Sequence, residues 1–414
     1  MTKTNEGIET GKKPVQSRNA MRTFLLLLTM LLIWGGANAL FSRREQDADF
    51  LWIWLGNKLI LEGTSPYSAE STLALQQALT GEEIAPDQYQ HPIPFPAYSA
   101  FILFPSGLLP YSTAYHIWRN LQFPMLFAAL YLMKRFLNLE MRWAQEHFFF
   151  FAGSIGFLYP IVSYALGQIS IFIFFLFSLL FYFSQRKMTF LAGASMAFIA
   201  IRPDMFILAC VTLVVILWDA RQALFKIGFA AFAVLLVFNL ATLPLIGFWY
   251  VDWIDILRGY SAGNPFAHYP LEMLPNTIGQ VIVVAAVIIY LAWQVLRFIK
   301  KRTESETLLL VSSTVIVFSL ANKLTGTYHM TLLLIPALIL LHLYSNSKLR
   351  WLVWLTMLSP WAYWYTPSGS ESKDWLSSLI VPLCFLSLQV IYLLIVSPIQ
   401  LQANSTHIPG GKAS

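Results

Sequence analysis

Apolar runs long enough to cross a lipid bilayer recur along most of this chain. A helix that rises 1.5 Å per residue needs about 20 apolar residues to cross the hydrocarbon core. Ten runs close to this length cover residues 22–41, 112–133, 146–164, 168–184, 224–246, 276–297, 306–322, 328–344, 351–366 and 375–396. Runs of this length favour helices, so the sequence predicts an all-α polytopic membrane protein.

The composition agrees with membrane insertion and argues against several other classes of protein. Hydrophobic residues make up 57% of the chain and charged residues only 12%, whereas soluble domains carry about 25% charged residues. The two cysteines, Cys210 and Cys384, lie inside apolar segments, which argues against a disulfide framework and a cysteine metal site. The net charge of +6 follows the membrane topology, so no nucleic-acid partner is expected.

The basic residues give the orientation, because cytoplasmic loops carry an excess of Lys and Arg. Placing residues 1–21 in the cytoplasm collects most of the 27 basic residues inside. With the two short arms of a hairpin at 188–218 counted as spans, we expect twelve crossings in one membrane domain, 22–398. Both tails, 1–21 and 399–414, then lie on the cytoplasmic side of the inner membrane. A full crossing at 94–110 would reverse the later basic clusters, so we expect an outer-leaflet or re-entrant helix there.

The first outer loop, 41–111, is the most polar part of the chain. Eight of the 21 acidic residues fall in it, at Glu45, Asp47, Asp49, Glu62, Glu70, Glu82, Glu83 and Asp87. Asp49 begins an aromatic and aliphatic stretch that suits a helix in the membrane interface. Partial desolvation there would raise the basicity of its carboxylate. Asp49 as the N-cap of this helix is an alternative that is compatible with a catalytic role.

Further polar groups fall on the same outer face in this topology. Arg202 lies at the tip of the broken hairpin, where an arginine suits either an ion pair with Asp204 or an anion site. Lys323 and His329 flank a short outer turn. Gln168 follows a glycine at the end of a span, and Asn276 opens the span after a later outer loop, 247–275. No metal-ligand spacing and no phosphate-binding glycine loop is present.

Read in chain order, these pieces resemble glycosyltransferase family 87. Asp49-Phe50 followed by Gly63-Thr64-Ser65-Pro66-Tyr67 is similar to the family's Asp-Phe and Gly-x-x-Pro-Tyr block. The segment from Tyr89 to Pro94, which contains His91, resembles its aromatic-proline segment. Gly167-Gln168, Ile201-Arg202-Pro203, Pro275-Asn276-Thr277 and Tyr328-His329 resemble four later motifs. Arg202 replaces a lysine of the family's pattern, and one of its two histidines is missing.

The resemblance implies a GT-C-type fold and an enzyme that uses a polyprenyl-phosphate-linked sugar, with no cofactor and no metal. It implies transfer of a sugar, with mannose expected, to a lipid or glycan acceptor at the outer face. Asp49 would be the base, with Asp47 as the fallback, and His329 would assist. The expected substrate-binding residues are Arg202, Lys323, Gln168, Tyr67, His91 and Asn276. Alternatives are a flippase of lipid-linked sugars, a non-catalytic subunit of an envelope-assembly complex, and a ligase-type transferase that uses a diphosphate donor.

Overall fold

The computed structural model describes residues 28, 31–32, 34–36, 39, 49–85, 90–103, 106–139, 144–263, 269–274, 276–322, 327–364 and 372–396. Within these ranges the chain is helical and contains no β-strand. In the amino-terminal half the helices are α2 (Phe50–Leu61), α3 (Ala69–Thr80), α4 (Ser99–Ile102), η1 (Ser106–Leu108), α5 (Tyr111–Phe136), α6 (Ala144–Ile155), α7 (Leu158–Ala165), α8 (Ser170–Gln185), α9 (Thr189–Ile199) and α10 (Pro203–Ile216). The remaining helices are α11 (Arg221–Ile246), α12 (Tyr250–Gly263), η2 (Pro270–Met273), α13 (Thr277–Lys301), α14 (Glu304–Ala321), η3 (Thr327–Leu333), α15 (Leu334–Leu343), α16 (Arg350–Trp364), α17 (Ser372–Ile391) and the π-turn η4 (Tyr392–Val396).

Four helical segments of the described chain are long and apolar enough to cross a membrane. They are Arg221–Ile246, Thr277–Lys301, Glu304–Ala321 and Ser377–Val396. Shorter apolar helices occupy several other predicted runs, including α8, α9 and α10. An all-α protein with membrane-spanning character is therefore supported, whereas the number of twelve crossings stays a prediction.

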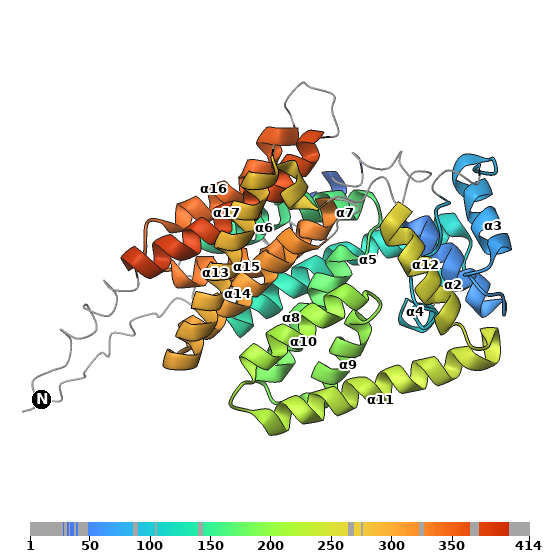
Figure 1. Ribbon diagram of the computed structural model, residues 1–414, viewed down its shortest axis with the longest axis horizontal. Helices are drawn as coiled ribbons and strands as arrows, with labels where there is room; N and C mark the ends of the chain where they lie inside the picture. The colour runs from blue at the N-terminus through green and yellow to red at the C-terminus, as the bar shows by residue number, and fades with distance from the viewer. Residues whose placement is uncertain are drawn as a thin grey trace, which may run out of the picture.

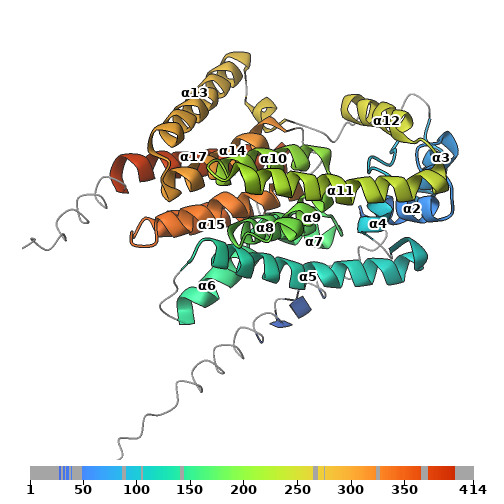
Figure 2. The same cartoon turned by 90° about the horizontal axis from the view of Figure 1, so that it is seen from below.

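The helices divide into a bundle and, at one end of it, a group of four helices, α2, α3, α4 and α12, called the cap. In Figures 1 and 2, α2, α3, α4 and α12 gather at the same end, while α13 to α17 lie toward the other. Helix α11 connects the two regions, and its last turn meets the end of α2, where the Leu245 carbonyl oxygen lies 3.5 Å from an ideal Cβ position on Gly63. Figure 2 also shows α13 splayed away from the bundle on the side opposite α5.

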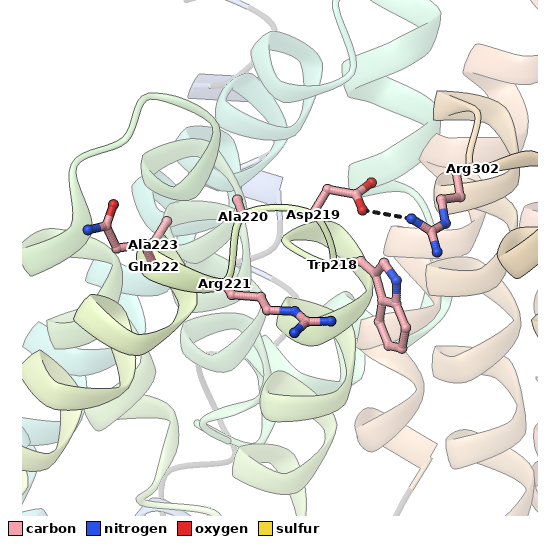
Figure 3. A pocket seen from close by; sticks show the side chains of 7 residues that line it. All are labelled: Trp218, Asp219, Ala220, Arg221, Gln222, Ala223 and Arg302. Carbon is pink, nitrogen blue, oxygen red and sulfur yellow. Dashed lines mark hydrogen bonds and ion pairs between the residues drawn. The ribbon is translucent and has the colours of Figure 1, made fainter.

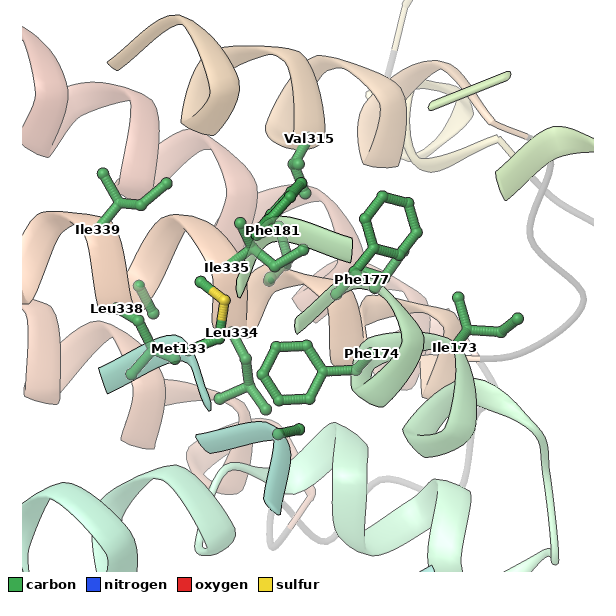
Figure 4. Packing of buried hydrophobic residues seen from close by; sticks show 14 of the residues in the cluster. Met133, Ile173, Phe174, Phe177, Phe181, Val315, Leu334, Ile335, Leu338 and Ile339 are labelled. Atoms are coloured by element: carbon green, nitrogen blue, oxygen red, sulfur yellow. The ribbon is translucent and has the colours of Figure 1, made fainter. Parts of the chain in front are cut away.

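Helices α8 and α15 form the centre of the bundle. Phe174, Phe177 and Phe181 project from α8 and are fully buried. They pack with Leu334 and Leu338 of α15, together with Met133 of α5 and Val315 of α14 (Figure 4). Packing of this kind contributes most of the helix association inside a bilayer, because lipid tails are as apolar as the side chains themselves.

In the described part of the proline-containing segment 94–110, the helical residues form the four-residue helix α4 and the single turn η1. Three side chains donate hydrogen bonds to its carbonyl oxygens. Tyr67 Oη donates to Phe95, Trp253 Nε1 to Pro94 and Trp54 Nε1 to Leu109, at 2.8, 3.0 and 2.9 Å. Protein side chains thus satisfy three carbonyl oxygens of this irregular backbone.

Two aromatic segments of the predicted outer face are buried by protein. Helix α2 forms where an interfacial helix was expected, but Phe50, Leu51 and Ile53 are buried inside the protein. Trp249, in the later outer loop, is only 1% exposed and contacts Tyr67. Protein side chains therefore cover these aromatic residues.

Candidate functional site

Asp49 lies at the start of α2, and its carboxylate is committed to a distant partner. It occupies the N-cap position, yet its side chain makes no capping hydrogen bond. The Nε2 group of Gln168 instead donates a hydrogen bond to Asp49 Oδ2. Asp49 thus holds the expected N-cap position, but its carboxylate accepts a hydrogen bond from Gln168 instead of from the backbone of α2.

A glycine turn holds Gln168 in place. Helix α7 ends in a Schellman motif, in which the Gln168 N–H donates to Ser163 O at 2.9 Å and the Gly167 N–H donates to Tyr164 O at 3.3 Å. Gly167 has φ +65°, a conformation that strains residues with a side chain. The Gly167 carbonyl accepts a hydrogen bond from Trp118 Nε1 at 2.8 Å. The turn is thus fastened to α5.

The same glycine allows α2 and α5 to approach the turn closely. An ideal Cβ on Gly167 would lie 3.0 Å from Phe50 Cβ and 3.1 Å from a ring carbon of Tyr115. Phe50 follows Asp49 directly and stacks on the Trp118 ring, with the ring centroids 5.9 Å apart. The start of α2, the first turns of α5 and the α7–α8 turn therefore form one packed unit that sets the geometry between Asp49 and Gln168.

Asp49 differs from the other described acidic residues of the first outer loop. Glu62, Glu70, Glu82 and Glu83 are all exposed, whereas Asp49 is partly buried. Desolvation by this burial raises the pKa of Asp49 to about 6, and the hydrogen bond from Gln168 opposes part of the rise. A carboxylate with this pKa is ionised at neutral pH and more basic than an exposed aspartate, as a general base requires.

A second polar group forms where α9 turns into α10. Arg202 precedes Pro203 at the first position of α10. Its guanidinium binds the Asp204 carboxylate through two hydrogen bonds, from Nε to Oδ1 at 3.0 Å and from Nη2 to Oδ2 at 2.6 Å. Asn322, which caps the end of α14, donates from Nδ2 to the same Oδ2 atom at 3.0 Å. The expected ion pair with Asp204 is thus formed.

His329 joins this group from η3. The Nη1 group of Arg202 donates to His329 Nδ1 at 2.8 Å. A guanidinium has no acceptor atom, so Nδ1 must accept and the ring proton lies on Nε2. His329 is 6% exposed, and its ring packs on Tyr328 with centroids 4.4 Å apart. Asp204 and Arg202 together therefore fix the ring as a neutral hydrogen-bond donor at Nε2.

The elements that carry the two polar groups pack against each other through η3. Helices α7 and α8, whose connecting turn carries Gln168, both pack against η3, which carries His329. Helix α10, which begins beside Arg202, packs against both α8 and α14. Tyr98 Oη of the cap also donates to the Ala200 carbonyl oxygen at 2.6 Å, which links the cap to the α9–α10 turn. The structure thus pairs Asp49 with Gln168 and Arg202 with His329, and the elements that carry the two pairs pack on one another.

Three other predicted site residues make contacts of their own. Tyr67 is buried, and its hydroxyl donates to Phe95 O. Asn276 is exposed and caps α13 by accepting a hydrogen bond from the Gly279 N–H at 2.6 Å. His91 has φ +50° and lies 5.9 Å from the Trp52 ring, centroid to centroid. Lys323 and Asp47 lie outside the described residues.

Asn322 is the contact that sequence reasoning missed. It follows α14 directly and precedes Lys323, which was singled out for its charge. Its distance of 118 residues from Asp204 left no local signal of the hydrogen bond. The one signal in the sequence was that Asn322 is a polar residue at the outer end of a predicted apolar helix.

Among the described residues, no group of three His, Cys, Asp or Glu side chains is placed to hold a metal ion. Comparison of the chain with protein-family models, with curated proteins and with solved structures found no match. The resemblance to glycosyltransferase family 87 therefore rests on the motif residues alone, and an assignment of function must rest on the chemistry of the site.

Proposed function

We propose that this protein is a membrane glycosyltransferase that moves a sugar, with mannose expected, from a polyprenyl-phosphate donor to an acceptor hydroxyl at the outer face. The observation that carries the proposal is the partly buried Asp49 carboxylate, held by Gln168, with its pKa raised to about 6. A helix cap or a surface acid needs neither this burial nor this partner. A GT-C-type fold with twelve spans, two cytoplasmic termini and an inner-membrane location belongs to the same proposal.

In the proposed reaction Asp49 acts as the general base. The acceptor oxygen attacks the anomeric carbon of the sugar and forms the new C–O bond while its proton passes to Asp49. The bond between the anomeric carbon and the phosphate oxygen breaks, and the lipid phosphate leaves with the electron pair. Attack from the opposite side inverts the anomeric configuration. No redox partner takes part in this balance.

Arg202 and His329 would stabilise the leaving phosphate. An arginine and a neutral histidine with its proton on Nε2 both donate hydrogen bonds, which suits an oxygen that gains negative charge. Asp204 and Asn322 would hold the arginine in place. The resemblance adds Lys323 to this group. The donor's prenyl chain would lie in the bilayer beside the bundle.

The first test is transfer from radiolabelled polyprenyl-phosphate sugars in membranes by Asp49→Asn. We expect transfer to fall by about 10²–10⁴-fold, the usual contribution of a general base, with donor binding retained. Glu82→Gln, an exposed acid of the same loop, serves as the control and should keep full activity. Near-normal transfer by Asp49→Asn would refute the assignment of the base. Movement of labelled lipid without new glycosidic bonds in the wild type would favour a flippase.

A second test addresses the phosphate site. Arg202→Lys keeps the charge but loses the bidentate contact with Asp204, so the donor KM should rise while the acceptor KM stays the same. Arg258→Lys, an exposed arginine of α12, is the matched control. An unchanged donor KM in Arg202→Lys and in Arg202→Ala would contradict a role of Arg202 in phosphate binding.

A further inference from the structure

A pocket lies at the end of α11 that is remote from Asp49. It has a volume of about 560 Å³ and is lined by Trp218, Asp219, Arg221 and Arg302, with Ala220, Gln222 and Ala223 (Figure 3). Helix α11 has 26 residues, about 39 Å at 1.5 Å per residue, and its far end meets the cap at Gly63. This pocket therefore cannot belong to the proposed transfer site.

The walls of the pocket bring two arginines together from distant parts of the chain. Arg302 donates to Asp219 Oδ1 at 3.1 Å, and Figure 3 shows Arg221 and Trp218 extending to one side of that pair. The ion pair is exposed, with 49% and 71% of the two side chains accessible, so it contributes little stability. Stabilisation of the fold by the Asp219–Arg302 pair therefore does not account for Arg221 or for the pocket.

The surroundings carry an excess of positive charge. Residues 217–226 and 297–307 contain six basic and three acidic side chains, a net charge of +3: Arg221, Lys226, Arg297, Lys300, Lys301 and Arg302 against Asp219, Glu304 and Glu306. Glu306 is already bound by Arg297, from Nη2 at 2.5 Å. Among the residues that line the pocket, Arg221 and Arg302 outnumber Asp219, so the lining carries a net positive charge, which suits a phosphate group.

An exposed apolar surface begins on α11 one helical turn after Arg221. Phe225, Phe229 and Phe232 project from the first turns of α11 after Arg221, and their exposed fractions are 75%, 65% and 62%. Positions that are three or four residues apart fall on one helix face, so these rings form a stripe that descends from Arg221. Trp218, 38% exposed, lines the pocket and packs on Phe298 with the ring centroids 5.8 Å apart. Tryptophan is enriched at membrane interfaces.

We propose that this pocket binds the phosphate of an anionic phospholipid, with the acyl chains along the phenylalanine stripe of α11. A basic pocket at a helix end that is continuous with exposed aromatic rings matches a ligand with a charged head and an apolar body. A soluble anion would use the arginines but not the rings. The proposal depends on membrane insertion and not on the transfer reaction.

The test is native mass spectrometry of the full-length protein with phosphatidylglycerol or phosphatidylcholine added. We expect phosphatidylglycerol to bind more tightly, and Arg221→Gln to weaken it about fivefold, the usual contribution of one basic residue near a lipid surface. Arg221→Gln leaves the Asp219–Arg302 pair in place, so folding is preserved. Arg186→Gln, an exposed arginine in another turn of the chain, is the matched control and should change nothing.

A second measurement locates the bound lipid. Brominated phosphatidylglycerol should quench Trp218 fluorescence, seen as the difference between the wild type and Trp218→Phe. Equal binding of the two lipids, or equal effects of Arg221→Gln and Arg186→Gln, would overturn the proposal. Displacement of phosphatidylglycerol by millimolar inorganic phosphate would assign the pocket to a free anion and would also overturn it.

Discussion

The ionised form of Asp49, which would act as the base, should destabilise the folded protein. Burial raises its pKa from 3.8 to about 6, so the folded protein binds this proton more tightly than the unfolded protein does. The destabilisation is absent below about pH 4, grows as the pH rises to about 6 and is complete above it. The difference in pKa corresponds to at most about 3 kcal/mol at neutral pH.

Asp49→Asn should therefore stabilise the protein while it slows transfer. Asparagine keeps an oxygen that accepts the Gln168 hydrogen bond but carries no charge to desolvate. We expect the apparent Tm in detergent to rise at pH 7 and to stay near the wild-type value at pH 4. Glu70→Gln, an exposed acid, should leave Tm unchanged at both pH values. A lower Tm for Asp49→Asn at pH 7 would mean that the ionised carboxylate stabilises the fold.

Gln168 should set the pH dependence of the reaction. Its hydrogen bond lowers the pKa of Asp49, so Gln168→Leu should raise that pKa further. Because the base must be ionised, the acidic limb of kcat/KM should lie near pH 6 in the wild type and at higher pH in Gln168→Leu. Gln77→Leu, an exposed residue of α3, is the control. If the acidic limb does not shift in Gln168→Leu, the limb does not report the ionisation of Asp49.

The sequence indicated single residues better than their partners. It singled out Asp49 among eight acids, and it named Gln168, Arg202 and His329 separately. The contact between Asp49 and Gln168 spans 119 residues, and that between Arg202 and His329 spans 127. Neither a helix period nor a motif encodes such a distance, because the pairing depends on how whole helices pack.

At the scale of elements, two motif glycines have a conformational origin. Gly63 and Gly167 end α2 and α7 in left-handed conformations, at φ +78° and +65°. Each closes a Schellman motif, with Thr64 N–H donating to Leu59 O after α2 and Gln168 N–H donating to Ser163 O after α7. Helix termination alone would select both glycines. Their presence therefore supports the fold more directly than it supports a reaction.

Gly167→Ala should disturb the site beyond the cost of the turn. A left-handed alanine costs about 1–2 kcal/mol, and here the methyl group would also crowd Phe50 and Tyr115. Gly81, which ends α3 at φ +77°, has no atom within 4 Å of its Cβ position and so isolates the conformational cost. We expect Gly167→Ala to lose most transfer activity and Gly81→Ala to keep it. Equal losses, measured at matched protein levels, would show that the close packing at Gly167 is unimportant.

Helix positions followed from apolar patterning, but helix breaks did not. The predicted span 146–164 is divided into α6 and α7, where Gly156 and Phe157 separate the two helices. The predicted run at 328–344 begins as the 3-10 segment η3, which carries His329. Mean hydropathy over a window does not detect such short interruptions. They nevertheless determine where polar groups such as His329 lie relative to the apolar helices. The position of His329 thus depended on a detail that the pattern could not supply.

For the whole molecule, charge asymmetry predicts two ends with different chemistry. The cap with Asp49 and the pocket with Arg221 lie at opposite ends of α11. The sequence predicted this division from its basic clusters and acidic first loop, whereas the packing of α2 inside the cap required the structure. An apolar helix that precedes a span can lie on lipid or against protein with the same sequence pattern, so periodicity alone does not decide between them.

The topology leads to a direct labelling prediction. With Cys210 and Cys384 replaced by serine, single cysteines are introduced at Glu82 in the cap and at Asn346 between α15 and α16, two exposed positions. In intact cells a membrane-impermeant maleimide should label Glu82→Cys at once and Asn346→Cys only after permeabilisation, because the basic residues Lys348 and Arg350 hold the second site in the cytoplasm. Labelling of Asn346→Cys in intact cells would reverse the orientation. It would also place Asp49 on the cytoplasmic side, where an outer-face reaction could not use it.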